Sequence, residues 1–362
     1  MYDCLIVGAG FAGSSAARIL ADAGKRVCVI DRRPHVGGNA FDEYDRYGVL
    51  VHRYGPHIFH TNSERVWLFL SRFSDWYPYE HRVLSVVGDS FYPFPINRQT
   101  LNAFFGLTLR SSADVESTLA GLRVPCANPL NVEDYVLAHL GHDLYKRFFY
   151  NYTLKQWGIE PRFIASGVAA RIPYRENEED RYFTDKYQGI PREGYTILFQ
   201  RLLDHENINV QLSSEYNRAN KRIARHVIFT GRVDEYFGFS LGILAYRSLR
   251  FEWNHFPFVE MYQPVGTVNY PEDPEYTRIT EFKHLTGQMC RGTTIVTEYP
   301  QSSGEPFYPM PTAEAAELYL RYRELVMREV SVTFVGRLAQ FRYYNMDQAV
   351  GAGIAAGRHL LD

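Results

Sequence analysis

The first forty residues constrain the fold of this chain more than any other segment. The apolar run Cys4–Val7 leads into Gly8-Ala9-Gly10-Phe11-Ala12-Gly13, an alanine-rich stretch follows, and a second apolar run, Val27–Ile30, ends at Asp31. This order predicts a strand, a tight turn, a helix and a second strand that ends in a carboxylate. The first glycine permits the turn, the second lets the backbone approach a pyrophosphate, and the third lets helix and strand pack closely. We therefore expect a dinucleotide here, with Asp31 accepting hydrogen bonds from ribose hydroxyls, rather than a glycine-rich turn without a ligand.

Two further glycine-rich segments narrow the dinucleotide to FAD. Gly37-Gly38-Asn39 follows Asp31 by a few residues and offers a second stretch of bare backbone along a bound cofactor. Flavoproteins of the glutathione-reductase type carry such a segment, whereas simple nicotinamide dehydrogenases usually lack it. Near the C-terminus, Val332–Val335 predicts a strand and Asp347–Gly357 predicts a helix of small residues. The N-terminus of that helix would stabilise the negative charge of a reduced flavin beside its N1 and O2 atoms.

The composition favours a small-molecule partner and a reducing compartment. The net charge of −2 over 362 residues leaves no basic excess for binding a nucleic acid or a membrane surface. We find neither a charged-then-apolar leader nor an apolar run of ~20 residues, and we expect a cytoplasmic protein. Cys4, Cys28, Cys126 and Cys290 form no CxxC pair, so we expect four buried thiols. The 27 tyrosines suit stacking on a base and hydrogen bonding to phosphates or sugars, although core packing is the default role for most of them.

The order of elements predicts an α/β protein with a discontinuous FAD-binding domain. We assign residues 1–75, 190–240 and 312–362 to this Rossmann-like domain of the glutathione-reductase type. Residues 76–189 are expected to form a hairpin and an inserted helical substrate domain, with a mobile loop near 165–181. Residues 241–311 are expected to form an antiparallel β-sheet domain that covers the substrate, because apolar and polar residues alternate there. Predicted helix caps are Ser63, Asn131 and Thr312.

Several sequence motifs resemble segments of one enzyme family. They are Tyr54–Thr61 (YGPHIFHT), Tyr152–Gly158 (YTLKQWG), Arg181–Phe183 with Tyr187–Pro191, and Tyr276–Glu281 (YTRITE). These motifs resemble those of bacterial-type UDP-galactopyranose mutases. They occur in the same order as in that family, and the resemblance extends from Met1 to about residue 360. Phe148 and Tyr152 are four residues apart, so they can share a helix face and sandwich an aromatic base, although a core stripe is the commoner meaning of this spacing.

The resemblance implies an isomerase that uses FAD without net redox change. The family interconverts UDP-galactopyranose and UDP-galactofuranose, the latter for cell-wall polysaccharides. Reduced FAD acts as the nucleophile, its N5 attacks the anomeric carbon, and UDP leaves and later returns. This is covalent catalysis, and it requires the protein to hold the sugar near N5, to stabilise the departing diphosphate and to exclude water. A homodimer is implied in the same way.

The resemblance also implies which residues form the site. Arg171, on the mobile loop, and Arg278, on the sheet, are expected to hold the diphosphate, because a guanidinium donates two parallel charge-assisted hydrogen bonds. The alternative is that both arginines pair with surface acids, such as those at 176–180. His57 falls beside the flavin, where it can tune N5 through hydrogen bonding. Further expected substrate residues are His81, Phe148, Tyr152, Thr153, Trp157, Tyr182, Phe183, Arg247, Asn269, Glu298, Tyr308, Tyr343 and Asn345. The expected cofactor residues are Gly8, Gly10, Phe11, Ala12, Gly13, Asp31, Arg32, Gly38, Asn39, His57, Ile58, Arg337, Met346, Asp347 and Gln348.

Departures from the family and other protein classes leave alternatives open. This chain has Asn345 where relatives commonly carry the Asp of a Tyr-x-Asp-Met motif. We therefore expect hydrogen bonding rather than general-base chemistry at this position. His81 stands where relatives often carry Asn in the nucleotide pocket. An oxidoreductase of the amine-oxidase type is the main alternative, since the Gly-Gly-Asn segment and the terminal helix occur there too, and a non-catalytic FAD-binding protein is a third possibility. His57 and His60 are three residues apart, but no suitable third ligand is nearby, and we expect no metal.

Overall fold

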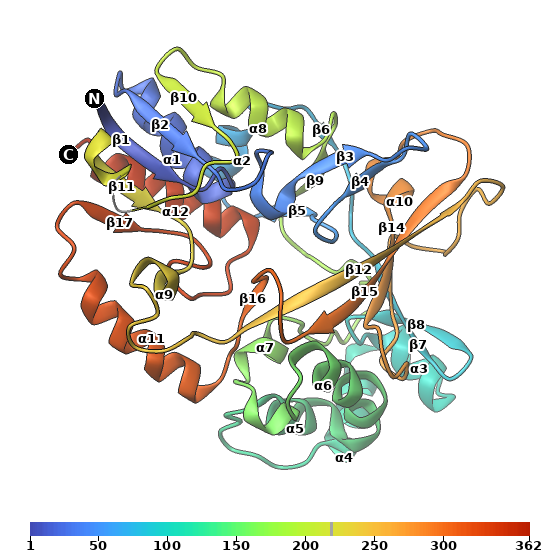
Figure 1. The fold of residues 1–362 in the computed structure, drawn as a ribbon. Coiled ribbons are helices and arrows are strands. Elements are labelled where there is room, and N and C mark those ends of the chain that lie inside the picture. The colour runs from blue at the N-terminus through green and yellow to red at the C-terminus, as the bar shows by residue number, and fades with distance from the viewer. Residues whose placement is uncertain (218–219) are drawn as a thin grey trace. The chain divides into compact units, whose positions relative to one another are not determined.

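The chain forms two compact units, each assembled from segments that are distant in the sequence. The structure is a computed structural model that describes residues 1–217 and 220–362 (Figure 1). Unit 1 contains Met1–Tyr79, Asp185–Ala245 and Ala316–Asp362. Unit 2 contains Glu80–Thr184 and Tyr246–Ala315. The chain therefore leaves unit 1 twice and returns to it twice.

Unit 1 is built on a parallel sheet of five strands in the order β10-β2-β1-β11-β17. The strands are β1 (Tyr2–Val7), β2 (Val27–Ile30), β10 (Ile208–Gln211), β11 (Ala224–Phe229) and β17 (Val332–Phe334). β1 lies in the middle and pairs in parallel with β2 and β11. Every residue of β2 is buried, as expected for a parallel sheet whose faces are both covered by other elements. The sheet confirms the Rossmann-like topology that the first forty residues predicted.

Helices and two small sheets complete unit 1. The helices are α1 (Phe11–Asp22), α2 (Glu64–Leu70), α8 (Tyr195–Leu203), α9 (Val233–Tyr236), α12 (Met346–His359) and the short 3-10 helices Gly38–Ala40 and Asn220–Ile223. One small sheet pairs β3 (Asp42–Tyr44) with β4 (Leu50–His52), and the other has the order β5 (Phe59–Thr61), β9 (Tyr187–Pro191), β6 (Trp76–Tyr77). Ser63 caps α2, because its side chain accepts a hydrogen bond from Val66 N, which confirms the predicted start of this helix.

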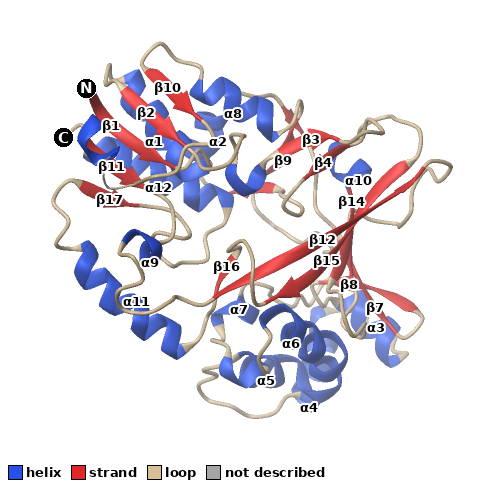
Figure 2. Ribbon diagram, viewed as in Figure 1, coloured by secondary structure: helices blue, strands red, loops and turns tan. Residues whose placement is uncertain are grey.

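Unit 2 contains a sheet of seven strands in the order β16-β12-β15-β14-β13-β7-β8 (Figure 2). The strands are β7 (Val83–Val87), β8 (Ser90–Phe94), β12 (Tyr246–Phe256), β13 (Thr267–Asn269), β14 (Arg278–Glu281), β15 (Thr293–Gln301) and β16 (Tyr308–Pro309). β12, β15, β14 and β13 pair antiparallel, as the alternating pattern of residues 241–311 predicted. The predicted hairpin β7–β8 is also present, and β7 pairs in parallel with β13. The hairpin is therefore part of the same sheet.

The helices of unit 2 lie mostly within residues 98–170, where they enclose an apolar core with strands β7 and β8. They are α3 (Arg98–Phe105), α4 (Ser112–Leu122), α5 (Val132–Leu144), the π-helical segment Tyr145–Tyr150, α6 (Asn151–Trp157), the 3-10 helix Pro161–Phe163, α7 (Gly167–Ala170) and α10 (Phe282–Thr286). α11 (Ala313–Val326) begins in unit 2 and continues in unit 1. Asn131 caps α5, with its side chain accepting from Asp134 N at 2.9 Å, and Thr312 accepts from Ala315 N at 3.3 Å. Both predicted caps are confirmed.

Two of the four cysteines differ from the sequence prediction. Cys4 and Cys28 are buried in β1 and β2, but the thiol of Cys126 is exposed and Cys290 is only half-buried. The expectation of four buried thiols is therefore wrong for the latter two, because both lie in loops rather than in the core strands. Among the residues that the structure describes, no helix combines the length and the apolar character needed to cross a membrane.

Candidate functional site

The glycine turn of unit 1 has the geometry that a dinucleotide needs. Gly8 has a φ of 106°, and a Cβ there would lie 2.0 Å from Oγ1 of Thr230. A Cβ on Gly13 would lie 1.9 Å from the carbonyl oxygen of Gly8, so the turn and α1 approach too closely for a side chain. α1 begins after Gly10, and the first turn of a helix presents N–H groups without intrahelical partners. Such a helix start binds phosphate groups well.

Asp31 connects the end of β2 to the glycine turn. Its Oδ2 atom accepts a hydrogen bond from Ala9 N at 2.8 Å, and its Oδ1 atom accepts one from Arg33 N at 2.9 Å. A carboxylate oxygen can accept two hydrogen bonds, so Asp31 can hold the turn and also accept from a ribose hydroxyl. The carboxylate lies beside the turn, and its contact with ribose stays a prediction.

A second stretch of bare backbone lies against the glycine turn. Gly37 N donates a hydrogen bond to Ala9 O at 2.9 Å, and a Cβ on Gly38 would lie 3.1 Å from the Cα atom of Gly10. Two backbone segments without side chains therefore meet here. A cofactor can approach both of them more closely than it could approach any other residue type.

The start of α12 joins segments from both ends of the chain. The backbone N–H of Asn345 donates to Oε1 of Gln348 at 2.9 Å, and Oδ2 of Asp347 accepts from Oγ1 of Thr61 at 2.9 Å. The first turn of α12 is thus fixed to itself and to β5. Of the other predicted cofactor residues, Phe11, Ala12 and Ile58 are buried, Asn39, Arg337 and Met346 are half-buried, and Arg32 is exposed.

Two side chains that the sequence analysis did not single out hold the peptide groups of His57. Its N–H donates to Nδ1 of His52 at 3.0 Å, and its carbonyl oxygen accepts from the hydroxyl of Tyr195 at 3.0 Å. His52 is fully buried, and burial lowers its pKa to about 3, so it is neutral and Nδ1 can act as an acceptor. A signal for His52 in the sequence is its place at the end of the apolar run Val49–Val51.

In unit 2, strand register aligns three predicted substrate residues. Asn269 on β13 is opposite Arg278 on β14, and Arg278 is opposite Glu298 on β15. Directly opposed residues of neighbouring strands project from the same face of a sheet. Asn269, Arg278 and Glu298 therefore form one row, although 29 positions separate the first from the last.

A close ion pair lies at the centre of this row. Nε of Arg278 is 2.9 Å from Oε2 of Glu298, whose side chain is fully buried, while the side chain of Arg278 is 25% exposed. Burial disfavours the charge on Arg278, but the attraction of Glu298 outweighs it and raises the pKa of Arg278 well above its usual value. Burial also raises the pKa of Glu298, and Arg278 partly offsets that effect. Arg278 is therefore a permanent cation held at a partly exposed position.

Helix α6 and the strand β16 add further predicted residues to this part of unit 2. The ring centroids of Trp157 and Tyr308 are 6.2 Å apart. Arg247, opposite Tyr308 in the register, donates to the carbonyl oxygens of Gln156 at 2.9 Å and Lys155 at 3.0 Å. The guanidinium of Arg247 thus fixes the last turn of α6. Tyr152 is half-buried and Thr153 is buried on the same helix.

Phe148 occupies the apolar core, which was the alternative to its role in a base sandwich. The side chain is 2% exposed, and its ring contacts those of Tyr92 and Phe104, with centroids 5.6 and 5.4 Å away. Residues 145–150 are π-helical, so the four-residue spacing from Phe148 to Tyr152 does not place them on one face as it would in a regular α-helix.

His81, Tyr182 and Phe183 form an aromatic group. His81 is 5% exposed, and its ring centroid lies 5.7 Å from that of Tyr182 and 6.2 Å from that of Phe183. Its carbonyl oxygen accepts from Tyr182 N at 2.6 Å. The structure thus brings together three residues from two segments that were predicted to border the nucleotide.

The acidic run near Arg171 has other arginine partners. Glu178 pairs with Arg98 at 2.9 Å, Glu179 with Arg181 at 2.6 Å, and Asp180 with Arg82 at 3.0 Å. Arg171 is exposed in the turn after α7. Backbone hydrogen bonds also fix the segment after this turn, including Arg175 N to Ile96 O at 2.8 Å and Arg98 N to Asn177 O at 3.0 Å.

The remaining predicted residues belong to unit 1. Tyr343 is 39% exposed, and the guanidinium of Arg337 lies 5.0 Å from the centroid of its ring. His60 lies 2.9 Å from Asp185, measured between Nδ1 and Oδ2. Within residues 1–217 and 220–362, no three His, Cys, Asp or Glu side chains are grouped so that they could hold a metal ion.

The fold and the site define an α/β protein with a Rossmann-like dinucleotide-binding domain. Residues 6–73 match the family model of the NAD(P)-binding Rossmann-like domain, and residues 147–343 match the model of UDP-galactopyranose mutase. The chain belongs to the UDP-galactopyranose mutase family, whose named members are isomerases. Membership of this family, together with the dinucleotide site of unit 1, implies a flavin cofactor.

Full-length relatives support this assignment. The chain is 38% identical to a dTDP-fucopyranose mutase of Escherichia coli, over 98% of this chain and 97% of the relative. It is also 38% identical to a probable UDP-galactopyranose mutase of Klebsiella pneumoniae, over 99% and 94%. Similarity to an (S)-6-hydroxynicotine oxidase of Paenarthrobacter nicotinovorans covers only 26% of this chain, at 31% identity. In sequence, the similarity to an oxidase thus covers about a quarter of the chain, and the similarity to the mutases covers nearly all of it.

Solved structures share the fold. A crystal structure of reduced UDP-galactopyranose mutase has a TM-score of 0.80 and 16% sequence identity, with 100% of this chain and 94% of that chain covered. A putative protoporphyrinogen oxidase from Exiguobacterium has a TM-score of 0.67 at 14% identity, with 99% and 98% covered. At these identities the likeness shows a common fold for the two enzyme types.

Proposed function

We propose that this protein interconverts UDP-galactopyranose and UDP-galactofuranose and requires reduced FAD. The observation that carries the proposal is the row Asn269-Arg278-Glu298, in which a buried carboxylate fixes a partly exposed guanidinium. A fixed guanidinium suits a diphosphate, which it can bind with two charge-assisted hydrogen bonds. Family membership and the full-length relatives support this choice of reaction.

The residues of unit 1 fit FAD. The close approach of Gly38 to Gly10 leaves a surface that a single Cβ would obstruct, and the start of α1 offers N–H groups for a pyrophosphate. Asp31 would bind the adenosine ribose, and the first turn of α12 would lie near the flavin ring. When bound and reduced, FAD supplies the nucleophilic N5 atom for the anomeric carbon of the sugar.

The chain itself would bind and orient the nucleotide sugar. Arg278 would bind the diphosphate and stabilise the negative charge that builds up as UDP leaves. Arg171 would add a second guanidinium from the turn after α7. His81, Tyr182 and Trp157 would border the uridine, because aromatic rings pack well on a base. Since each charge-assisted hydrogen bond contributes about 1.5–3 kcal/mol, loss of either arginine should weaken UDP binding roughly tenfold to two-hundredfold.

A dTDP-linked sugar is the second candidate substrate. The specific observation is that identity to the dTDP-fucopyranose mutase equals that to the probable UDP-galactopyranose mutase, at 38% each. Uracil and thymine differ by one methyl group, a difference that binding sites discriminate weakly, and the two nucleotides also differ by the 2′-hydroxyl of the ribose. The rates of conversion of the two sugars therefore decide between the two candidate substrates.

The proposal is tested with photoreduced, FAD-loaded protein under argon. UDP-galactofuranose is supplied, and UDP-galactopyranose is followed by chromatography, with dTDP-fucofuranose in a parallel reaction. We expect conversion of the UDP sugar by the reduced protein and none by the oxidised protein. Preferred conversion of the dTDP sugar would select the second candidate, and no conversion of either sugar would refute a mutase function.

Arg278→Ala and Arg250→Ala form a matched pair for the same assay. Arg250 is on β12, opposite Tyr299, and therefore projects from the other face of the sheet. We expect Arg278→Ala to weaken UDP binding and slow conversion, and Arg250→Ala to leave both unchanged. Equal behaviour of the two variants would remove Arg278 from the diphosphate site.

We also propose a cytoplasmic homodimer. The monomer mass is 41.9 kDa, so light scattering of the purified protein should give twice this value. A monomer mass at micromolar concentration would refute the dimer.

A further inference from the structure

Lys155 lies in a cage of three backbone carbonyl groups. It belongs to α6, and its Nζ atom donates to Tyr270 O at 2.6 Å, to Tyr276 O at 2.7 Å and to Asp273 O. An ammonium group has three N–H donors and no acceptor, so each donor of Lys155 has its own partner. Burial lowers its pKa to about 8, and the ammonium form therefore predominates at neutral pH.

The three carbonyl groups belong to the loop that connects β13 to β14. The loop begins after Asn269 and ends before Arg278, two residues of the proposed diphosphate row. Tyr270 N donates to Thr277 O at 2.9 Å, so the loop closes directly beside these two residues. Lys155 thus holds the loop whose two ends carry Asn269 and Arg278.

Strand β12 of the same sheet also holds this turn of α6. Arg247 on β12 donates to the carbonyl oxygens of Lys155 and Gln156. α6 also carries Trp157, which is proposed to border the uridine, and Tyr152, which the family resemblance predicted as a substrate residue. Lys155 therefore links the helix on the uridine side to the strand that carries the diphosphate arginine.

We propose that Lys155 is a positioning residue that sets the distance between the uridine-binding helix α6 and Arg278. This inference rests on the proposed function, because it assigns both elements to one nucleotide. A ligand with two binding parts is bound more tightly when both parts of the site are held at the separation that the bound ligand needs. Release of the loop would leave uridine contacts on α6 intact and misplace the guanidinium.

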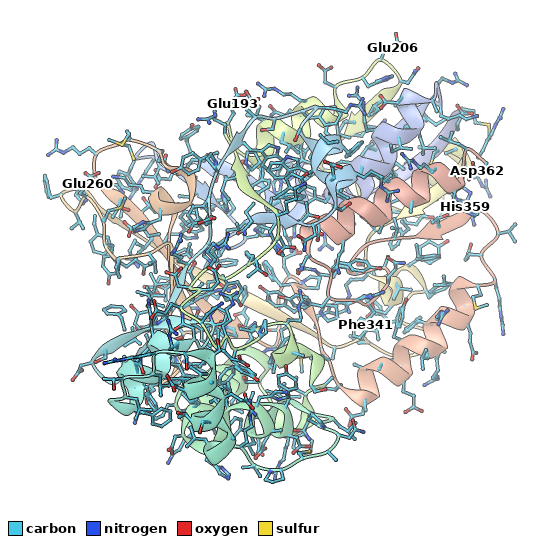
Figure 3. The ribbon with its side chains drawn as sticks, turned by 180° about the vertical axis from the view of Figure 1, so that it is seen from behind. Glu193, Glu206, Glu260, Phe341, His359 and Asp362 are labelled. Carbon is cyan, nitrogen blue, oxygen red and sulfur yellow. The ribbon has the colours of Figure 1, made fainter. Side chains whose placement is uncertain are left out.

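Lys283 supplies a matched control in the same unit. It is 1% exposed at its side chain, and its Nζ donates to Glu260 Oε1 at 2.7 Å, Cys290 O at 2.9 Å and Gly292 O at 3.1 Å. Glu260 lies in the loop after β12 (Figure 3). Lys283 is thus another buried lysine that joins loops, but none of its partners belongs to the proposed site. A purely structural role predicts similar effects of Lys155→Met and Lys283→Met on nucleotide binding.

The experiment measures UDP and uridine binding by calorimetry with FAD-loaded protein. We expect Lys155→Met to weaken UDP binding roughly tenfold or more, the effect of losing one charge-assisted contact, and to change uridine binding less than about twofold. Lys283→Met should change neither. Lys155→Arg, which keeps the charge but not the compact ammonium, should fall between wild type and Lys155→Met, and it replaces Lys155→Met if that variant does not fold.

A double-mutant cycle with Arg278→Ala provides the decisive readout. If Lys155 acts by positioning Arg278, the effects of Lys155→Met and Arg278→Ala on UDP binding are not additive, whereas those of Lys283→Met and Arg278→Ala are additive. Two results would overturn the inference and leave the proposed function standing. One is that the Lys155 variants bind UDP as tightly as the wild type does, and the other is that the effects in the first cycle are additive. Failure of the wild type to bind either UDP or dTDP would instead refute the proposed function, and the inference with it.

Discussion

Replacement of Gly353 by alanine should separate helices α1 and α12. A Cβ on Gly353 would lie 2.2 Å from the carbonyl oxygen of Ala12, and 3.1 Å from its Cα atom. Cβ atoms essentially never approach another heavy atom within 3.0 Å, so the helices must move apart by nearly 1 Å. The obstacle is backbone, which cannot rotate aside as a flexible side chain does.

The expected magnitude follows from two opposing terms. Overpacking of a close interface costs about 1–3 kcal/mol, and we expect the upper end because a carbonyl oxygen blocks the methyl group. Alanine is favoured over glycine inside a helix by about 1 kcal/mol. The net loss for Gly353→Ala should thus be about 2 kcal/mol in the free energy of unfolding.

Gly351 provides the control on the same helix. The nearest atom to a Cβ on Gly351 would be Cγ2 of Val66 at 4.0 Å, an ordinary contact. Gly351→Ala should therefore gain the helix term alone and stabilise the protein by up to about 1 kcal/mol. The two variants should differ by about 3 kcal/mol, although each adds one methyl group to α12.

Urea unfolding and FAD titration test this prediction. Gly353→Ala should unfold at lower urea and bind FAD more weakly, since the start of α12 is proposed to lie near the flavin. FAD affinity of Gly351→Ala should match the wild type. Equal unfolding midpoints for the two variants would refute the reasoning from the close approach of α1 and α12.

Three further predictions concern His52, Asp42 and the pair Phe148 and Tyr152. His52 has a pKa of about 3 when folded, against the ordinary value of 6.5 in the unfolded chain. The unfolded chain therefore binds a proton that the folded chain does not, and stability falls as the pH drops below 6.5. At pH 5 this loss is about 2 kcal/mol. The free energy of unfolding in urea, measured at pH 8 and pH 5, should therefore change less in His52→Gln than in the wild type. An equal change in both proteins would exclude a neutral buried His52. Asp42→Asn should lower stability by about 2–3 kcal/mol, because the carboxylate is buried and accepts from the N–H groups of two residues at the start of α8; an unchanged urea midpoint would contradict this. Phe148→Ala should destabilise the protein by about 3–5 kcal/mol, whereas Tyr152→Ala should mainly weaken UDP binding. Urea unfolding and UDP titration of both variants test this prediction. The reverse result would place the Phe148 ring against the uracil base.

Local sequence patterns predicted the dinucleotide-binding part of the fold well. The glycine spacing between two apolar runs predicts a strand, turn, helix and strand because each of these elements depends on neighbouring residues. Ser63 and Asn131 were predicted as caps for the same reason, since a cap bonds to a backbone N–H three residues later. The family resemblance likewise predicted Arg278 and Glu298 as site residues. The structure pairs their side chains, and their contact with substrate stays a prediction.

Features that depend on contacts between distant segments were not predicted. The parallel pairing of β7 with β13 joins residues about 180 positions apart, and no local pattern specifies such a partner. The core position of Phe148 depends on the rings of Tyr92 and Phe104, and the exposure of Cys126 depends on what covers its loop.

The sequence by itself specified the groups on which the proposed chemistry depends. They are a glycine turn suited to a dinucleotide, an acid after the second strand, and Arg278 within a motif that resembles one of the mutase family. Only the tertiary structure decided which buried groups hold that chemistry in place. Lys155 appears in the printed sequence as one more cation on a helix, and His52 as one more histidine. Their roles follow from backbone atoms far away in the chain, because a hydrogen-bond partner is chosen by distance in space and not by distance in sequence.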